Sequence, residues 1–207
     1  MSSIKNIILD FGGVIIHIDY NNLRVAFEKL GYEDFALWYS QHRQEEIFDK
    51  LETGKISPEE FITKIGEELD LPLSPDQLKE AWNAILIGLP EENVEFLKKL
   101  HKDHKLFLLS NTNEIHEEAF TKMIVEKFGR NILPELFDKI YFSHQIGLRK
   151  PDKEVFQFVL DDSNLKAGET LFIDDSVQHL EGAKKAGIHT FHMPTNKMLS
   201  DVFEDLI

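Results

Sequence analysis

Four short apolar runs in this sequence are each followed by polar side chains that can do chemistry. The runs and the side chains after them are Ile4–Leu9 with Asp10, Leu106–Leu109 with Ser110 and Asn111, Ile140–Phe142 with Lys150 a few residues later, and Leu171–Ile173 with Asp174 and Asp175. In order along the chain, these groups are a carboxylate that can act as a nucleophile, a hydroxyl donor, a cation and a carboxylate pair.

Each of these groups also has an ordinary structural explanation when it is taken alone. Asp10 before Gly12 and Gly13 fits an Asx turn, and Ser110 fits a helix N-cap. A lysine before proline is usually solvated, and Asp174 with Asp175 could favour the start of a helix. Turn chemistry does not readily produce all four in this order, so their combination favours a functional site.

The elements that would position these residues alternate between strand and helix. Between the strands, apolar residues recur at helical intervals in four segments. These are Val94–Leu100, Ala119–Phe128, Val155–Val159 and Leu180–Ala186, the last with Gly187 as a C-cap. A weaker fifth strand is predicted over Ile188–His192. Apolar strands joined by helical crossovers predict a doubly wound, Rossmann-like parallel sheet, and functional residues collect at the carboxyl edge of such sheets.

The stretch from about Asn21 to Leu89 interrupts this alternation, because it has helical patterns and no predicted strand. Ser57 before Pro58 and Ser74 before Pro75 each predict a capped helix start. We therefore expect an all-helical cap over residues 19–89, inserted after the first strand into a catalytic core formed by residues 1–18 and 90–207.

Composition limits the possible partners. Hydrophobic residues make up 42% and charged residues 29% of the 207-residue chain, which is typical of a soluble folded protein. The net charge of −14 disfavours nucleic acid and membrane partners. The chain has no cysteine, and its first apolar run is too short for a signal peptide or membrane span. We expect a cytoplasmic monomer or homodimer.

The motifs resemble those of the haloacid dehalogenase superfamily of hydrolases over essentially the whole chain. They are Ile8–Val14 (ILDFGGV), Leu108–Thr112 (LLSNT), Gly147–Asp152 (GLRKPD), Phe172–Ser176 (FIDDS) and Glu181–Ile188 (EGAKKAGI). The helical insertion is similar to the superfamily's cap. Its pattern at Ile47, Phe48, Leu51, Glu52, Gly54, Ile56, Ser57, Phe61 and Trp82 is most similar to the bacterial group that includes alpha-D-glucose-1-phosphate phosphatase.

The resemblance implies a Mg²⁺-dependent phosphatase acting on a small phosphorylated metabolite, such as a sugar phosphate. Asp10 would attack phosphorus and form an aspartyl phosphate, with Lys150 and Ser110 as the other catalytic groups. Mg²⁺ would be held by Asp10, the Gly12 carbonyl and Asp175, while Asp174 orients a metal-bound water or Lys150. The substrate-binding groups implied are Gly12, Gly13, Ser110, Asn111, Lys150 and, from the cap, Glu46.

One position departs from the superfamily's phosphatase pattern. Gly12 stands where these enzymes usually carry a second aspartate, which serves as general acid and base, although the glucose-1-phosphatase-like group also has glycine there. Glu46 and His17 are replacement candidates, and each also fits an ordinary solvated role. His179 stands where that group often has asparagine.

Two other functions remain open. A 2-haloacid dehalogenase also uses the first aspartate and lacks the second, but it needs no metal. Without a cation, the acidic pair Asp174 and Asp175 beside Asp10 would be costly. A catalytically degenerate protein that binds a phosphorylated ligand or partner is the second alternative.

Overall fold

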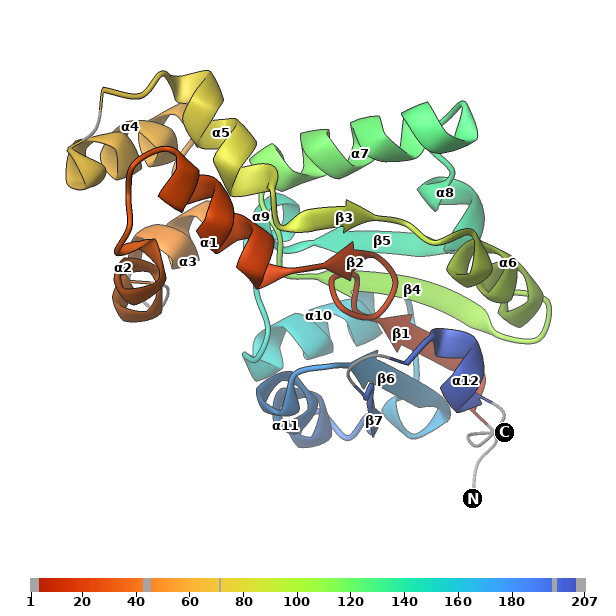
Figure 1. The fold of residues 1–207 in the computed structure, drawn as a ribbon. Helices are drawn as coiled ribbons and strands as arrows, with labels where there is room; N and C mark the ends of the chain where they lie inside the picture. The colour runs from red at the N-terminus through yellow and green to blue at the C-terminus, as the bar shows by residue number, and fades with distance from the viewer. Residues whose placement is uncertain (1–3, 43–45, 71, 195–196, 204–207) are drawn as a thin grey trace.

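The centre of the protein is a five-stranded parallel sheet with strand order β5-β4-β1-β6-β7 (Figure 1). The computed structural model describes residues 4–42, 46–70, 72–194 and 197–203. The strands are β1 (Asn6–Leu9), β4 (Lys105–Ser110), β5 (Lys139–Phe142), β6 (Thr170–Asp174) and β7 (His189–His192). Four of these strands coincide with the apolar runs of the sequence and β7 with the weaker fifth strand, so the predicted doubly wound parallel sheet is confirmed.

Helices cover both faces of this sheet. One face carries α6 (Glu91–Leu100), α7 (Glu114–Phe128), α8 (Leu133–Leu136) and α12 (Leu199–Phe203). The other carries α10 (Lys153–Asp162) and α11 (Val177–Lys185). Two short helices lie in the connections, α9 (Ser143–Ile146) and the 3₁₀ turn Ala167–Glu169.

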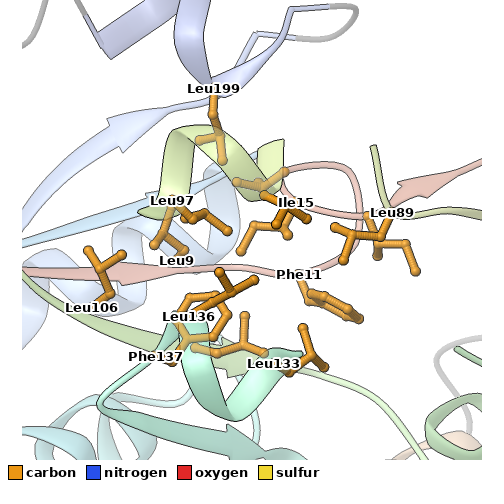
Figure 2. Close-up of a cluster of buried hydrophobic side chains, with 14 of the residues drawn as sticks. Leu9, Phe11, Ile15, Leu89, Leu97, Leu106, Leu133, Leu136, Phe137 and Leu199 are labelled. Carbon is orange, nitrogen blue, oxygen red and sulfur yellow. The ribbon is translucent and has the colours of Figure 1, made fainter. Parts of the chain in front are cut away.

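Strand β1 shows how the sheet divides the core in two. Successive side chains of a strand point to opposite faces. Ile7 and Leu9 therefore pack under α6 and α8, where Leu9 faces Leu97 (Figure 2). Ile8 packs on the opposite side, against α10 and α11. Because β1 is central and buried on both faces, the residue at its carboxyl end is held firmly.

The predicted cap is a separate group of helices at one end of the sheet (Figure 1). Its helices are α1 (Tyr20–Lys29), α2 (Phe35–His42), α3 (Glu46–Glu52), α4 (Pro58–Leu69) and α5 (Pro75–Asn83). They share an aromatic core in which Phe27 stacks on Phe35 and the edge of Phe61 meets Trp82. Burial of each such side chain stabilises the cap by about 2–3 kcal/mol.

The capped helix starts that the sequence predicted are present. Ser57 accepts a hydrogen bond from the Glu60 backbone N–H, and Glu60 accepts one from the Ser57 N–H. Ser74 and Gln77 form the same reciprocal pair at the start of α5. Each pair satisfies two backbone donors that a helix N-terminus otherwise leaves without partners.

The segment expected to be free of strands contains one, so that prediction was wrong. β3 (Leu86–Gly88) pairs antiparallel with β2 (His17–Ile18), and the resulting two-stranded ribbon connects the cap to the core. Three residues directly after a helix are too few to show an alternating pattern. The ribbon lies beside the cap boundaries proposed from the sequence.

Within the described residues, no helix has both the length and the apolar character needed to cross a bilayer.

Candidate active site

Asp10 occupies the position immediately after the central strand. Its backbone N–H donates to the Ile173 carbonyl at 2.9 Å, which ties it to β6, and its side chain is almost completely buried. Four buried residues, Asn6–Leu9, precede it and fix the direction of the chain. The sheet therefore presents one carboxylate at the centre of its carboxyl edge.

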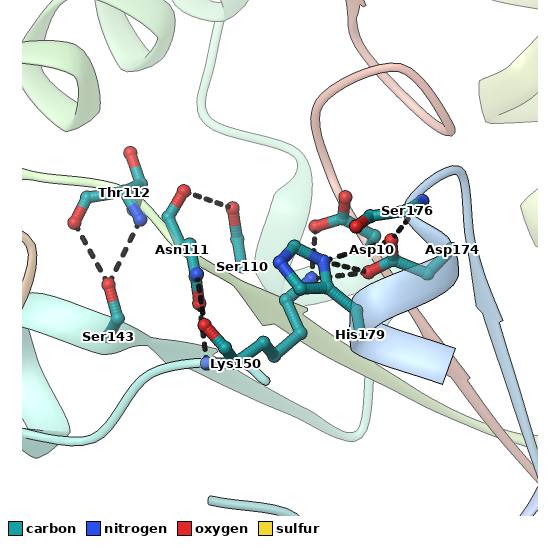
Figure 3. Close-up of polar contacts among 9 residues, drawn as sticks. All are labelled: Asp10, Ser110, Asn111, Thr112, Ser143, Lys150, Asp174, Ser176 and His179. Atoms are coloured by element: carbon teal, nitrogen blue, oxygen red, sulfur yellow. Dashed lines mark hydrogen bonds and ion pairs between the residues drawn. The ribbon is translucent and has the colours of Figure 1, made fainter. Parts of the chain in front are cut away.

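Lys150 is fully buried and joins two of the predicted carboxylates. Its Nζ donates to Asp10 Oδ1 and to Asp174 Oδ2, each at 2.7 Å (Figure 3). Burial alone would lower the pKa of Lys150, but the carboxylates of Asp10 and Asp174 outweigh burial and hold the pKa above its ordinary value. Lys150 is therefore a fixed cation beside the candidate nucleophile.

Asp174 has both carboxylate oxygens engaged within the protein. Besides Lys150, it accepts from the Ser176 backbone N–H at 2.7 Å and contacts His179 Nδ1 at 3.0 Å. Burial would raise the pKa of Asp174, but Lys150 and His179 outweigh it and lower the pKa to about 2. Asp174 is thus suited to orienting Lys150, and His179 supports it from α11.

A second acidic group, Asp175, lies against the loop that follows Asp10. Gly13 has a left-handed φ of 75°, and a Cβ at this position would overlap with Asp175 Oδ2. A glycine is required there because the loop turns back (Gly13 N–H to Ile16 carbonyl, 3.0 Å) while passing close to a carboxylate. The loop and Asp175 thus face each other beside Asp10.

The charges around Asp10 suit a divalent cation. Burial raises the pKa of the Asp10 carboxyl to about 7, Asp174 and Asp175 act in the same direction, and Lys150 opposes them. Burial and Asp174 also raise the pKa of Asp175. Ligand atoms of Asp10, Asp174 and His179 lie within 4.8 Å of one another, but Asp174 and His179 are already bonded to each other. Asp10 with Asp175 is therefore the better oxygen ligand set.

The end of β4 contributes the second predicted group. Asn111 accepts from the Lys150 backbone N–H at 2.9 Å, and its amide donates to the Lys150 carbonyl at 2.8 Å (Figure 3). Ser110 is buried, and its hydroxyl lies 3.4 Å from the Asn111 carbonyl, which leaves it able to donate to a ligand. Asn111 thus positions Lys150, a role that its sequence position did not reveal.

A cavity of about 140 Å³ separates this edge of the sheet from the cap. Its core side includes Phe11, Gly12, Ser110, Asn111, Thr112, Asn113, His116 and Phe120. Its cap side includes Tyr20, Tyr39, Phe48, Glu52 and Trp82, with Ile85 and Leu86 near the ribbon. A ligand held at Ser110 and Asn111 would extend toward the cap.

His116 is a cavity residue that the sequence did not identify. Its Nδ1 lies 2.8 Å from the Asn83 side-chain oxygen, so Nδ1 carries the proton and Nε2 is an acceptor. The ring stacks on Trp82 with 5.6 Å between centroids and 4° between planes. Burial lowers the pKa of His116 to about 4, so it is neutral near pH 7. Histidine spacing along the chain carried no signal of this contact.

The structure does not bring Glu46 or His17 into this cavity. Glu46 is the first residue of α3, its side chain is 81% exposed and it pairs with Lys50 at 2.7 Å. Helix α3 instead presents its last residue, Glu52, which lies roughly 9 Å further along the axis. His17 is exposed on β2, in a separate hollow with Leu89 and Lys127. Glu45, the neighbour of Glu46, lies outside the described residues.

A Rossmann-like core with a buried carboxylate–lysine pair under an inserted helical cap defines an enzyme of the cap-carrying hydrolase class. The haloacid dehalogenase-like hydrolases match residues 7–193, so the chain belongs to this family. The sequence-based prediction of the superfamily is thereby confirmed. The comparisons do not single out the group that includes alpha-D-glucose-1-phosphate phosphatase, and that finer resemblance stays a prediction.

Relatives that match most of this chain include named phosphatases. The chain is 35% identical to the D-ribitol-5-phosphate phosphatase of Bacteroides thetaiotaomicron, over 91% of both chains. It is 31% identical to the phosphorylated carbohydrates phosphatase of Thermotoga maritima, over 67% of this chain and 56% of that protein. These names agree with the expectation of a phosphoric monoester hydrolase.

Solved structures agree over nearly the whole chain. A HAD family enzyme of Bacteroides thetaiotaomicron, in a magnesium complex, is 32% identical with a TM-score of 0.88, covering 98% of this chain and 99% of that one. A predicted HAD-like hydrolase of Porphyromonas gingivalis is 32% identical with a TM-score of 0.87, covering 99% and 98%. An L-2-haloacid dehalogenase, at 20% identity and a TM-score of 0.65, shares the fold alone.

Proposed function

We propose that this protein is a Mg²⁺-dependent phosphatase that hydrolyses a small, hydroxyl-rich phosphate monoester through an aspartyl phosphate on Asp10. One observation carries the proposal. The fully buried Lys150 ammonium lies 2.7 Å from Asp10 and from Asp174, at the carboxyl edge of the sheet. A lysine buried in this way neutralises the charge of a carboxylate and of an incoming phosphate, which otherwise repel each other.

Asp10 is the nucleophile in this proposal. Its free oxygen attacks phosphorus, the bond to the leaving oxygen breaks, and water then hydrolyses the acyl phosphate and restores the carboxylate. Lys150 holds Oδ1, which leaves the other oxygen, Oδ2, to attack phosphorus. The Ser110 hydroxyl and the Asn111 N–H donate to the phosphoryl oxygens, with the N–H groups after Asp10 beside them.

The residues for a metal fit Mg²⁺, because Asp10, Asp175 and the Gly12 carbonyl offer only oxygen ligands. When bound, Mg²⁺ would neutralise charge on the transferring phosphoryl group. Support comes from the raised pKa values of both carboxyls and from the magnesium complex of the related Bacteroides thetaiotaomicron enzyme. Another structure of that enzyme contains both magnesium and inorganic phosphate.

The cavity favours a small, polar leaving group. Its volume of about 140 Å³ is below the ~300–1,000 Å³ of drug-sized sites. Its aromatic walls suit the C–H faces of a sugar or sugar alcohol, and His116 Nε2 can accept from a hydroxyl. The names of the ribitol phosphate and carbohydrate phosphate phosphatases support the same substrate class. We also propose that the protein is cytoplasmic.

Phosphate release from sugar phosphates, sugar alcohol phosphates and p-nitrophenyl phosphate, with Mg²⁺ or with excess chelator, tests the proposal. Asp10→Asn removes the nucleophile, so we expect activity to fall at least about a thousandfold. Asp19→Asn is the matched control, since Asp19 caps α1 and asparagine caps equally well. If the wild-type protein releases phosphate no faster than Asp10→Asn on every substrate, the proposal is contradicted. That result would favour a catalytically degenerate protein that binds a phosphorylated ligand or partner.

A further inference from the structure

A proton donor for the leaving group is missing from the loop after Asp10. Breaking the bond to an alkyl leaving group produces an alkoxide unless a proton is supplied, and the attacking water must later lose a proton. Gly12 has no side chain to do either. If the proposed phosphatase function is correct, another group that lines the cavity must transfer these protons.

Glu52 is the one carboxylic acid among the described residues that line the cavity. His116 lines it too, but its Nδ1 proton is committed to Asn83 and its low pKa, about 4, keeps Nε2 unprotonated near pH 7. Tyr20 and Tyr39 also line it, but a phenol is a much weaker acid than a carboxyl group. The chemistry of the lining therefore selects Glu52.

The position of Glu52 is fixed by the loop that carries Lys150. Glu52 ends α3, and its Oε2 lies 3.1 Å from Arg149 Nη2, while Arg149 also pairs with Asp49 one turn earlier on the same helix. Among the described residues, Oε2 is buried and has no hydrogen-bond partner besides this ion pair, and Glu52 lines the cavity. The Glu52 carboxyl is thus held by an ion pair next to the loop that carries Lys150, and it retains hydrogen-bonding capacity for a ligand.

The surroundings of Glu52 suit a group that alternates between two protonation states. Burial raises the pKa of the Glu52 carboxyl to about 7, against the opposing charge of Lys150. Efficient general acids and bases have a pKa near the operating pH. The Arg149 guanidinium, 3.1 Å from Oε2, favours the carboxylate as Lys150 does, so burial and two cations act on the Glu52 carboxyl in opposite directions.

We propose that Glu52 of the cap is the general acid and base of this enzyme, in place of the side chain that Gly12 lacks. As the Asp10 oxygen bonds to phosphorus and the leaving oxygen departs, the Glu52 proton moves to the leaving oxygen and yields an alcohol. Water then attacks phosphorus, its proton moves to the Glu52 carboxylate, and the bond to Asp10 breaks to give phosphate. Both residues finish as they began.

Leaving-group dependence tests this role. For Glu52→Gln, we expect kcat on sugar alcohol phosphates to fall about 10²–10⁴-fold, because an alkoxide needs the proton. Release of p-nitrophenolate, a stable anion, should slow less than about tenfold in its first turnover. Hydrolysis of the aspartyl phosphate still lacks its base, so rapid mixing should show a burst of p-nitrophenolate close to one per enzyme.

Three variants separate proton transfer from a structural role. Glu52→Asp should restore part of the lost kcat. Arg149→Met breaks the pairs to α3 but keeps the Glu52 carboxyl, so we expect less than about a tenfold loss, equal for alkyl and aryl substrates and without a burst. Glu67→Gln, at an exposed carboxyl of α4, should match wild type. Circular dichroism and thermal unfolding confirm that each variant folds.

Two results would overturn the proposal. The first is a kcat of Glu52→Gln on sugar alcohol phosphates that equals the kcat of the wild type. The second is an equal loss on alkyl and aryl substrates without a burst, as for Arg149→Met, which would leave Glu52 a positioning residue. Either result would leave the proposed phosphatase function intact. If that function were wrong, the wild-type protein itself would show no Mg²⁺-dependent phosphate release from any substrate.

Discussion

Lys150 depends on one amide for its position. Asn111 binds both the N–H and the carbonyl of Lys150, at 2.9 and 2.8 Å, so two neighbouring motifs are joined by two hydrogen bonds. A buried ammonium that must reach two carboxylates tolerates little displacement, since misplacement of about 1 Å can lower the rate about a hundredfold. Asn111 therefore acts through Lys150.

For Asn111→Ala we expect kcat to fall by about ten- to a hundredfold, and the free energy of unfolding to fall by about 1–3 kcal/mol, because two backbone groups lose their partner. Steady-state kinetics and urea unfolding measure these effects. Asn6→Ala is the matched control, because Asn6 is a buried asparagine at the other end of β1 that bonds Thr170. It should lose stability without loss of kcat, and an equal loss of kcat in both variants would contradict the positioning role.

The residues at the ends of strands could be identified from the sequence, because chemistry follows the strand there by only one or two positions. Asp10, Ser110 and Asp174 were found in this way, and the structure brings Asp10 and Asp174 onto the same lysine. The support that His179 gives to Asp174 was not predicted. It depends on which face of α11 turns toward β6, and that is set by packing rather than by spacing.

At the scale of elements, α11 lies unusually close to the loop after Lys150. A Cβ on Gly182 would overlap with the Pro151 carbonyl oxygen and approach Phe156 of α10. Only a residue without a side chain lets helix and loop meet at this distance. The helix that carries His179 and the loop that carries Lys150 are thereby held together.

Gly182→Ala should destabilise the protein by about 1–3 kcal/mol through overpacking, and should also lower kcat because the loop carrying Lys150 must move. Gly168→Ala makes the same chemical change where a Cβ meets nothing within 4 Å. We expect it to be neutral, or to add up to about 1 kcal/mol of stability. Thermal unfolding of both variants measures the difference, and equal melting temperatures would show that the close approach can relax at no cost.

The two kinds of strand explain why elements were predicted unequally. β4 and β6 are buried on both faces, so their sequences are continuous apolar runs bounded by polar residues. β3 has three residues, none of them fully buried, and it forms only because β2 lies beside it. A strand defined by a partner far away in the chain leaves little local pattern to read.

At the scale of the whole molecule, the cavity exists only where cap and core meet, and the sequence reveals least about such contacts. Arg149 and Asp49 are 100 residues apart in the chain, yet their contact brings α3 to the loop of Lys150. The sequence indicated a helix around Glu46 and Glu52, but not which end would face the core. The end that does so is the one that carries Glu52.

The contact between α5 and α7 makes stability depend on pH in a predictable direction. His116 stacks on Trp82 across this contact, and burial lowers its pKa to about 4, against about 6.5 in an unfolded chain. Between these values the unfolded state binds more protons than the folded state. Stability therefore falls as pH drops from about 6.5 to about 4, and the His116 contribution is fully lost below that range.

We expect His116→Gln to remove this dependence. The difference in free energy of unfolding between wild type and variant should be constant above about pH 7, and should shift against wild type by up to about 3 kcal/mol as pH falls to 4. Urea unfolding at half-unit pH steps measures it. Asn83→Ala keeps the buried imidazole and should retain the dependence, because burial lowers the pKa. If wild type and His116→Gln lose stability in parallel across this window, then His116 already binds its proton in the folded protein at these pH values, and the ring stacked between cap and core is open to water.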